Sequence, residues 1–124
     1  MALAVFRRFK ATVSKYESIS AMSLSTSDIR LALPQWEIDE EKQIISRTFV
    51  FVDFVQAFEF MKHCAEYANE IDHHPDWSNS WNKVVVHLST HSAKKITQLD
   101  IDFAHQMDSL AAQINAHPPH DLPR

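Results

Sequence analysis

The 124-residue sequence predicts an α+β domain in which helices pack on one face of an antiparallel four-stranded sheet. Two long segments, one from Asp53 to before Pro75 and one from Thr97 to before Ala116, carry apolar residues at the three- and four-residue spacing of amphipathic helices. Two other segments, 36–52 and 77–91, are rich in the β-branched and aromatic residues that strands favour. With a short helix ahead of them, the predicted order is helix, two strands, helix, two strands, helix.

The short helix is expected from about Asp28, capped by one of the residues 25–27 and ended by Pro34. Its apolar residues are Ile29, Leu31 and Leu33. A β-hairpin should follow over 36–52, because Trp36 and Ile38 alternate with acidic residues ahead of an apolar run at 44–52. We expect its turn at residues 39–42.

The pair Asp53 and Gln56 resembles a capping box that opens a long helix, which should end before Pro75. Its predicted buried stripe consists of Phe54, Ala57, Phe58, Met61, Ala65 and Ala68. Strands at 77–81 and 83–91 should follow, with Asn82 in the turn between them.

The two faces of the last predicted strand should differ in character, because successive side chains point to opposite sides of a sheet. Val84, Val86 and Leu88 should face the helices, and Val85, His87, Ser89 and His91 should face the other way. Thr97 and Asp100 then form another N-terminal cap pair. The predicted buried stripe of the last helix is Leu99, Phe103, Met107, Leu110 and Ile114.

The chain contains no glycine, which disfavours sites built from backbone groups. Phosphate-binding loops, dinucleotide-binding turns and the nucleophile elbow of α/β-hydrolases all need glycine where the backbone bends sharply or approaches a ligand. No apolar run reaches 18 residues, so no transmembrane helix is expected. The single cysteine, Cys64, excludes an intramolecular disulfide and a multi-cysteine zinc site, and we expect a buried structural thiol. We therefore expect side chains to carry the function.

Charge and composition divide the chain into a leader, a domain and a tail. Residues 1–22 form a basic extension: the first 16 positions hold four of the 12 basic residues and none of the 16 acidic ones. This composition is typical of a mitochondrial transit segment, and an extension that packs on the domain or on a neighbouring subunit fits equally well. The domain, 23–116, is acidic, which argues against nonspecific nucleic-acid binding, and 117–124 form a proline-rich tail. The expected compartment is mitochondrial or cytoplasmic.

Histidines gather near the ends of predicted elements. His73 and His74 lie between the long helix and Pro75, and His91 ends the last predicted strand. Clustered surface histidines, a metal site and proton transfer are three interpretations. A metal site is disfavoured because adjacent histidines rarely both bind one ion, and because four residues of strand separate His87 from His91 by roughly 13 Å. Imidazole titrates near neutral pH and no paired serine or cysteine nucleophile is evident, so acid–base chemistry fits better.

Four short segments carry a family resemblance: Asp72-His73-His74-Pro75-Asp76-Trp77, Trp81-Asn82-Lys83-Val84, Leu88-Ser89-Thr90-His91, and Asp100. At these spacings, across residues 69–108, the sequence resembles the pterin-4a-carbinolamine dehydratase family. The resemblance implies dehydration of a 4a-hydroxytetrahydropterin to the quinonoid dihydropterin, which recycles tetrahydrobiopterin after aromatic amino-acid hydroxylation. In this elimination the C4a hydroxyl leaves as water and N5 gives up its proton, so no metal or other cofactor is needed.

The resemblance also implies which residues form the site. His73, His74 and His91 would carry the chemistry, with His73 and His91 as the proton-transfer pair and His74 more concerned with binding. The residues expected to bind the pterin are Asp72, Pro75, Trp77, Ser89 and Thr90. Among these, Trp77 would pack against the ring, and the backbone of 89–90 would meet its amide-like edge. Asp100 would orient an imidazole or cap the last helix.

One position departs from the family pattern. Four residues before His73 the family usually has an acidic residue, commonly glutamate, where this chain has Asn69. Glu70 is not a simple substitute, because neighbouring residues on a helix point about 100° apart. Asparagine can hydrogen-bond to an imidazole but cannot stabilise its cation as a carboxylate does. We therefore expect lower activity or a different orienting group.

The resemblance further implies a homo-oligomer, a dimer or a tetramer, formed by joining sheets edge to edge and packing helices into a bundle. Neither a membrane nor nucleic acid is expected as a direct partner. Some animal members of the family also act as dimerisation cofactors of a homeodomain transcription factor. An interaction module of that kind, or a pterin-binding protein without significant turnover, is therefore the alternative to the enzyme.

Overall fold

The computed structural model describes residues 24–116, so the expected leader and the tail at 117–124 lie outside the described residues. Within this range the chain forms α2 (Thr26–Ala32), β1 (Glu37–Asp39), β2 (Ile44–Val50), α3 (Phe54–Ile71), β3 (Asp76–Ser80), β4 (Lys83–Leu88) and α4 (Gln98–Ala116). This order confirms the predicted α+β class. Over residues 24–116, no helix is both long and apolar enough to span a membrane.

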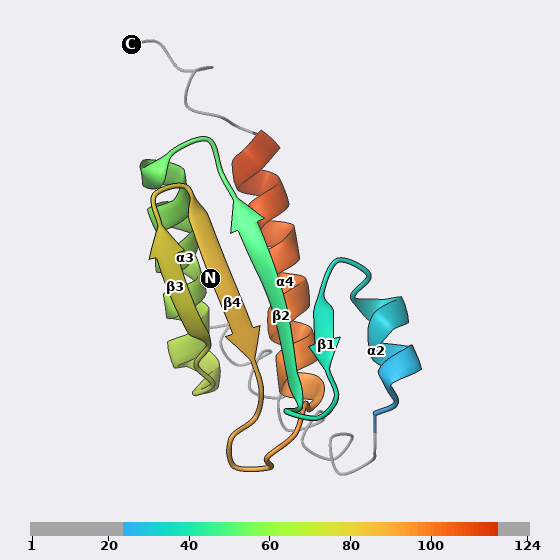
Figure 1. Cartoon of the computed structure of the whole chain (residues 1–124). Coiled ribbons are helices and arrows are strands. Elements are labelled where there is room, and N and C mark those ends of the chain that lie inside the picture. The colour runs from blue at the N-terminus through green and yellow to red at the C-terminus, as the bar shows by residue number, and fades with distance from the viewer. Residues whose placement is uncertain (1–23, 117–124) are drawn as a thin grey trace, which may run out of the picture.

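The strands form one antiparallel sheet in the order β1-β2-β4-β3. The central strands β2 and β4 are paired from Ile45 opposite Leu88 to Val50 opposite Lys83. α3 and α4 lie against one face of this sheet, and α2 lies beyond β1 at its edge (Figure 1). The corner from α3 into β3 and the loop from β4 into α4 lie at the same end of the sheet, the lower end in Figure 1.

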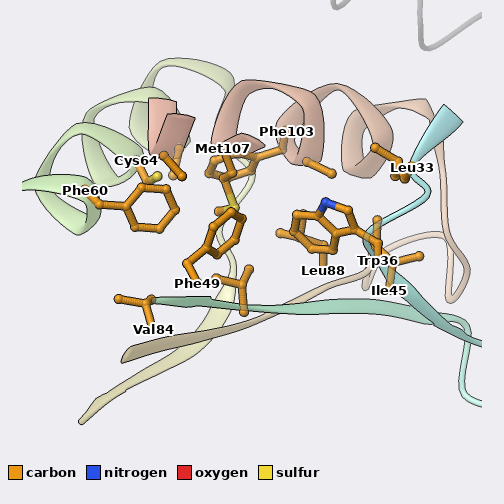
Figure 2. Packing of buried hydrophobic residues seen from close by; sticks show 14 of the residues in the cluster. Leu33, Trp36, Ile45, Phe49, Phe60, Cys64, Val84, Leu88, Phe103 and Met107 are labelled. Atoms are coloured by element: carbon orange, nitrogen blue, oxygen red, sulfur yellow. The ribbon is translucent and has the colours of Figure 1, made fainter. Parts of the chain in front are cut away.

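The core fills the space between the sheet and the two long helices (Figure 2). The largest fully buried apolar side chains are Leu33, Ile45, Phe60, Val84, Val86, Leu88, Phe103 and Met107. Burial of a side chain of this size stabilises the fold by about 1.5–3 kcal/mol. Because β4 contributes three of them at alternate positions, its predicted helix-facing side is confirmed.

The buried face of α3 differs from the predicted stripe. The structure buries Gln56, Ala57, Phe60, Cys64, Ala68 and Ile71, whereas Phe54, Phe58 and Ala65 are exposed. Apolar residues extend most of the way around the start of this helix, so their spacing alone fits more than one face. Contact with the sheet decides between these faces, because the Phe60 ring packs 4.7 Å from that of Phe49 and 5.0 Å from that of Phe51.

The other helices also depart in part from their predicted faces. Ser25 caps α2 as one of the expected candidates, but Leu31 is exposed because this short helix reaches the core mainly through Ile29. On α4, Leu99 and Leu110 are only half-buried. The residues that join Phe103, Met107 and Ile114 on the buried face of α4 are Asp100, Ile101, Ala104 and Ala111.

Strand β4 ends at Leu88, three residues short of the predicted end at His91. Beyond it, Thr90 and Lys95 form an isolated antiparallel bridge that encloses a turn at residues 91–94. His91 therefore lies on a turn and not on the strand, and its place is set by that bridge.

Without glycine, four other residues adopt left-handed backbone conformations in the described range: Gln43, Asp72, Trp81 and Lys94. Such a conformation costs a residue with a Cβ roughly 1–2 kcal/mol. Asp72 (φ 53°, ψ 46°) ends α3, and its N–H donates to the carbonyl of Ala68. The next N–H, of His73, donates to the same carbonyl at 3.0 Å. This closure fixes the direction in which His73 leaves the helix.

Candidate functional site

His73, just beyond the C-terminal end of α3, and Asp100, in the first turn of α4, form a buried pair at one end of the sheet. Nε2 of His73 lies 2.6 Å from Oδ1 of Asp100. The side chain of His73 is 9% exposed and that of Asp100 is 0% exposed. A charged group this deeply buried needs hydrogen bonds to compensate for lost hydration.

Two threonines supply those hydrogen bonds. The Thr90 hydroxyl donates to Oδ2 of Asp100 at 2.8 Å, and the backbone N–H of Thr97 donates to the same oxygen at 2.9 Å. The two threonine hydroxyl oxygens lie 2.7 Å apart. Asp100 thus contacts an imidazole through Oδ1 and, through Oδ2, accepts from the N–H of the residue that precedes α4. The network joins the end of α3, the β4–α4 loop and the start of α4.

His74 lies beside His73 but in a different environment. Its side chain is exposed, and its Nε2 lies 3.0 Å from Oδ1 of Asn69 on the last turn of α3. The residue at the usually acidic position of the family pattern therefore contacts the second histidine of the pair, not the first. A neutral amide oxygen accepts a hydrogen from the ring without adding a charge.

His91 is exposed at the rim of the same end of the sheet. Its Nε2 lies 3.5 Å from Oδ2 of Asp76, and the two side chains are 75% and 74% exposed. Asp76 is the first residue of β3 and directly follows Pro75. The contact therefore brings the turn at 91–94 against the corner that carries His73 and His74, so that all three histidines lie on adjoining segments.

The residues expected to bind the pterin are not equally accessible. Asp72 is exposed, and Pro75 and Ser89 are half-buried. Trp77 is half-buried and packs against the hydrophobic core, opposite the buried Val86 of β4.

Thr90 is buried, and its backbone is already paired. Its N–H donates to the carbonyl of Lys95, and its carbonyl accepts from the N–H groups of Ala93 and Lys95. In this structure Thr90 therefore acts through its hydroxyl, which supports Asp100, and its backbone groups are engaged within the protein.

Sequence reasoning missed two members of this site. The sequence predicts Thr97 only as a helix cap, and no pattern in it assigns Asp76 a place beside His91. The spacing of Thr97 and Asp100 indicates that the two residues lie close together, but not that their cap also holds a histidine. The contact between Asp76 and His91 depends on the turn after β4, for which the sequence carries no local signal.

Two further observations limit the chemistry of the described residues. Over residues 24–116, no group of three or more histidine, cysteine, aspartate or glutamate side chains could hold a metal ion. The thiol of Cys64 is buried, and burial raises its pKa from 9.0 to about 12. A thiol that stays protonated is a poor nucleophile, so the burial of Cys64, as expected, disfavours a nucleophilic role.

Comparisons with known proteins agree with the resemblance seen in the sequence. A family model described as "Pterin 4 alpha carbinolamine dehydratase" matches residues 20–110. A protein of Rhizorhabdus wittichii named "Putative pterin-4-alpha-carbinolamine dehydratase" is 46% identical over 80 residues, which cover 64% of this chain and 82% of the relative. A protein of Bordetella avium with the same name is 46% identical over 85 residues, covering 68% of this chain and 79% of the relative.

Two solved structures are also similar. The first is described as a transcriptional coactivator/pterin dehydratase from Brucella melitensis, with 41% identity and a TM-score of 0.67 over 73% of this chain and 99% of the other. The second is a pterin dehydratase-like protein described as a RuBisCO assembly factor in the alpha-carboxysome, with 20% identity and a TM-score of 0.55 over 62% of this chain and 89% of the other. At that identity the second match supports the fold alone.

Proposed function

Because the chain belongs to the pterin-4a-carbinolamine dehydratase family, we propose that it dehydrates a 4a-hydroxytetrahydropterin and so recycles tetrahydrobiopterin. In the reaction the C4a–O bond breaks and the hydroxyl takes up a proton to leave as water. The N5–H bond also breaks, and its electron pair forms the C4a=N5 bond of the quinonoid dihydropterin. An acid near C4a and a base near N5 are sufficient for this elimination.

The observation that carries the proposal is the buried pair of His73 and Asp100 beside two exposed histidines. Hydrogen bonding to Asp100 holds the His73 ring in one orientation, which is what a group that transfers a proton to a fixed ring atom needs. His91, on the facing turn, is the proposed second member of the proton-transfer pair. His74, held by Asn69, is proposed to bind the substrate.

The proposed binding residues border the histidine corner, which consists of the α3–β3 corner with His73 and His74 and the facing turn with His91. Asp72, Pro75 and Ser89 are at least partly accessible and can contact a ligand directly. Trp77 can offer only the part of its ring that the core leaves uncovered. Thr90 and Asp100 contribute to binding indirectly, by holding His73 in place.

An interaction module without significant turnover is the second candidate. The feature that favours it is the apolar surface at the start of α3, where Val55 and Phe58 are 70% and 57% exposed. The same surface supports a homo-oligomer, since large exposed apolar side chains that gather on one face indicate a protein–protein contact. Both candidates are compatible with pterin binding at the histidine corner.

Stopped-flow measurement of carbinolamine loss separates these candidates. We expect the wild-type chain to accelerate dehydration over the spontaneous reaction, and His73→Ala and His91→Ala to reduce that acceleration by about a hundredfold or more, the lower end for loss of a general acid or base. His63→Ala is the matched control, because this exposed histidine lies on α3 far from its C-terminal end. A wild-type rate equal to the spontaneous rate would refute the enzyme.

A further inference from the structure

The hydroxyl groups behind Asp100 form a chain whose direction can be deduced. A carboxylate oxygen only accepts hydrogen bonds, so the Thr90 hydroxyl uses its one hydrogen on Oδ2 of Asp100. The 2.7 Å contact between the two threonine hydroxyls then needs the hydrogen of Thr97. Hydrogen bonds therefore run from Thr97 to Thr90 and from Thr90 to Asp100.

This direction determines which oxygen of Asp100 serves His73. Oδ2 already accepts two hydrogens, from the hydroxyl of Thr90 and from the backbone N–H of Thr97. Both of these groups are donors to Oδ2, so this oxygen carries no proton of its own. Oδ1 is left to accept from the ring of His73, which lies 2.6 Å away.

We infer that Thr97 is a positioning residue which, through Thr90 and Asp100, holds neutral His73 as the tautomer with hydrogen on Nε2 and a lone pair on Nδ1. Nδ1 has no hydrogen-bond partner among residues 24–116, so it is the ring atom able to exchange a proton with a ligand. The tautomer follows from the geometry, whereas the use of Nδ1 as the base at N5 rests on the proposed function.

Thr97 contributes to this arrangement in a way that its role as a helix cap does not require. Its backbone N–H suffices to cap α4 with Asp100, but its hydroxyl is directed at Thr90 and not at the helix. Donation from Thr97 polarises the Thr90 hydroxyl and fixes its rotamer, which strengthens the next hydrogen bond in the chain. Without that hydroxyl, Thr90 can rotate away, and Oδ2 then loses one of its two donors.

The nitrogen NMR spectrum of His73 in the full-length protein tests the tautomer directly, because protonated and unprotonated ring nitrogens have well-separated shifts. The signals that disappear in His73→Gln are assigned to the ring nitrogens of His73. At a pH where the ring is neutral, we expect hydrogen on Nε2 and none on Nδ1. The opposite pattern, or an even mixture, would overturn the inference. This measurement is independent of turnover, so an inactive wild-type protein would refute the proposed function and leave the tautomer standing.

A pair of substitutions tests the part played by Thr97. Thr97→Val removes the hydroxyl, so it should introduce the second tautomer at His73 and lower kcat about three- to tenfold. Thr97→Ser keeps a hydroxyl and should therefore show the single tautomer and the kcat of the wild type. Thr48→Val, at an exposed position of β2, controls for the loss of a threonine hydroxyl elsewhere. An unchanged His73 spectrum in Thr97→Val, or a Thr97→Ser protein that behaves like Thr97→Val, would contradict the role of the hydroxyl. Should Thr97→Val fail to fold, Thr97→Ala, which also removes the hydroxyl, takes its place, and an unchanged His73 spectrum in Thr97→Ala would contradict the role of the hydroxyl in the same way.

Discussion

The amide oxygen of Asn69 lies 3.0 Å from Nε2 of His74, across the left-handed corner that ends α3. Asn69, four residues before His73, therefore forms its hydrogen bond with His74 and not with His73. An acidic side chain at this position would place its charge beside His74, the exposed member of the pair. The departure from the family pattern at Asn69 should therefore affect His74 more than His73.

Asn69→Glu should raise the dehydration rate about three- to tenfold, because a charge-assisted hydrogen bond stabilises an imidazolium better than a neutral one does. The measurement is the stopped-flow rate below saturating substrate, where binding of the substrate by His74 contributes to the rate. Glu70→Gln, at the neighbouring exposed position, should leave the rate unchanged. In a His74→Ala background the gain from Asn69→Glu should disappear. An unchanged or reduced rate in Asn69→Glu alone would count against the interpretation.

Asp100→Asn should lower kcat by about a hundredfold or more. A carboxamide has one acceptor oxygen, whereas Asp100 accepts from His73, from the Thr90 hydroxyl and from the Thr97 N–H through two oxygens. One of these donors must then face an NH₂ group, which disturbs the orientation of the ring and lowers the free energy of unfolding by about 1–3 kcal/mol. The measurements are kcat and urea unfolding of the same preparation.

Asp108→Asn is the matched control for that experiment. Asp108 is a half-buried carboxylate on α4 that accepts from the indole N–H of Trp36 and pairs with Arg47 of β2. Its loss should reduce stability by about 1 kcal/mol, the usual contribution of such a bond, and leave kcat unchanged. If Asp100→Asn kept wild-type kcat while losing stability in the same way, Asp100 would be a structural residue only.

Signals that act within a few residues predicted the start of α3 and its end before Pro75 correctly. Asp53 caps α3 through the N–H of Gln56 at 3.0 Å, as the capping-box pattern predicts. The helix ends at Ile71, ahead of Pro75 as predicted, although the left-handed Asp72 ends it three residues before the proline. The alternation in β4 predicted its buried face, because a strand between a helix layer and solvent has only two faces to choose from.

Features that depend on packing between distant segments could not be predicted from spacing. Which face of α3 is buried depends on where Phe49 and Phe51 of the hairpin meet Phe60. The hydrogen bond between His73 and Asp100 joins residues 27 positions apart and needs both the corner at Asp72 and the bridge at Thr90. The family resemblance placed both residues at the site, but their contact and the support from Thr97 required the fold.

The buried thiol of Cys64 should make the protein less stable in alkali. Burial raises its pKa from 9.0 to about 12, so the unfolded thiol loses its proton as the pH rises through 9 while the folded thiol keeps it. The unfolded state then binds fewer protons, and the free energy of unfolding should fall by up to about 1.4 kcal/mol per pH unit above pH 9.

Urea unfolding of the wild type and of Cys64→Ala at pH 8, 9 and 10 measures this effect. Cys64→Ala leaves a small cavity and should lower stability at every pH, but its loss of stability from pH 9 to 10 should be smaller than that of the wild type. Both proteins contain the same lysines and tyrosines, which titrate in the same range. The difference between the two slopes of unfolding free energy against pH therefore reports the contribution of the Cys64 thiol alone. Equal slopes would mean that Cys64 is accessible to solvent in the folded state.

Large apolar side chains are exposed at the end of the sheet opposite the histidine corner. They are Val50, Val52, Phe54, Val55, Phe58 and Trp81, from the end of β2, the following loop, the start of α3 and the β3–β4 turn. The hydrogen bond from Phe51 N–H to the carbonyl of Asn82 holds the loop after β2 against the β3–β4 turn. The rings of Phe54 and Phe58 stack on one another at 5.8 Å on the surface of α3.

Covering this apolar end with a second copy of the chain would remove it from water, so Phe58→Glu should shift a wild-type dimer or tetramer to a smaller species. Light scattering coupled to gel filtration measures the mass. Leu31→Glu replaces an even more exposed apolar residue on α2 and should leave the mass unchanged. Because the histidine corner lies at the other end of the sheet, the dissociated variant should still dehydrate the carbinolamine (Figure 1). A Phe58→Glu protein of wild-type mass would place the contact elsewhere, and one that dissociates and loses all activity would mean that the site needs a neighbouring subunit.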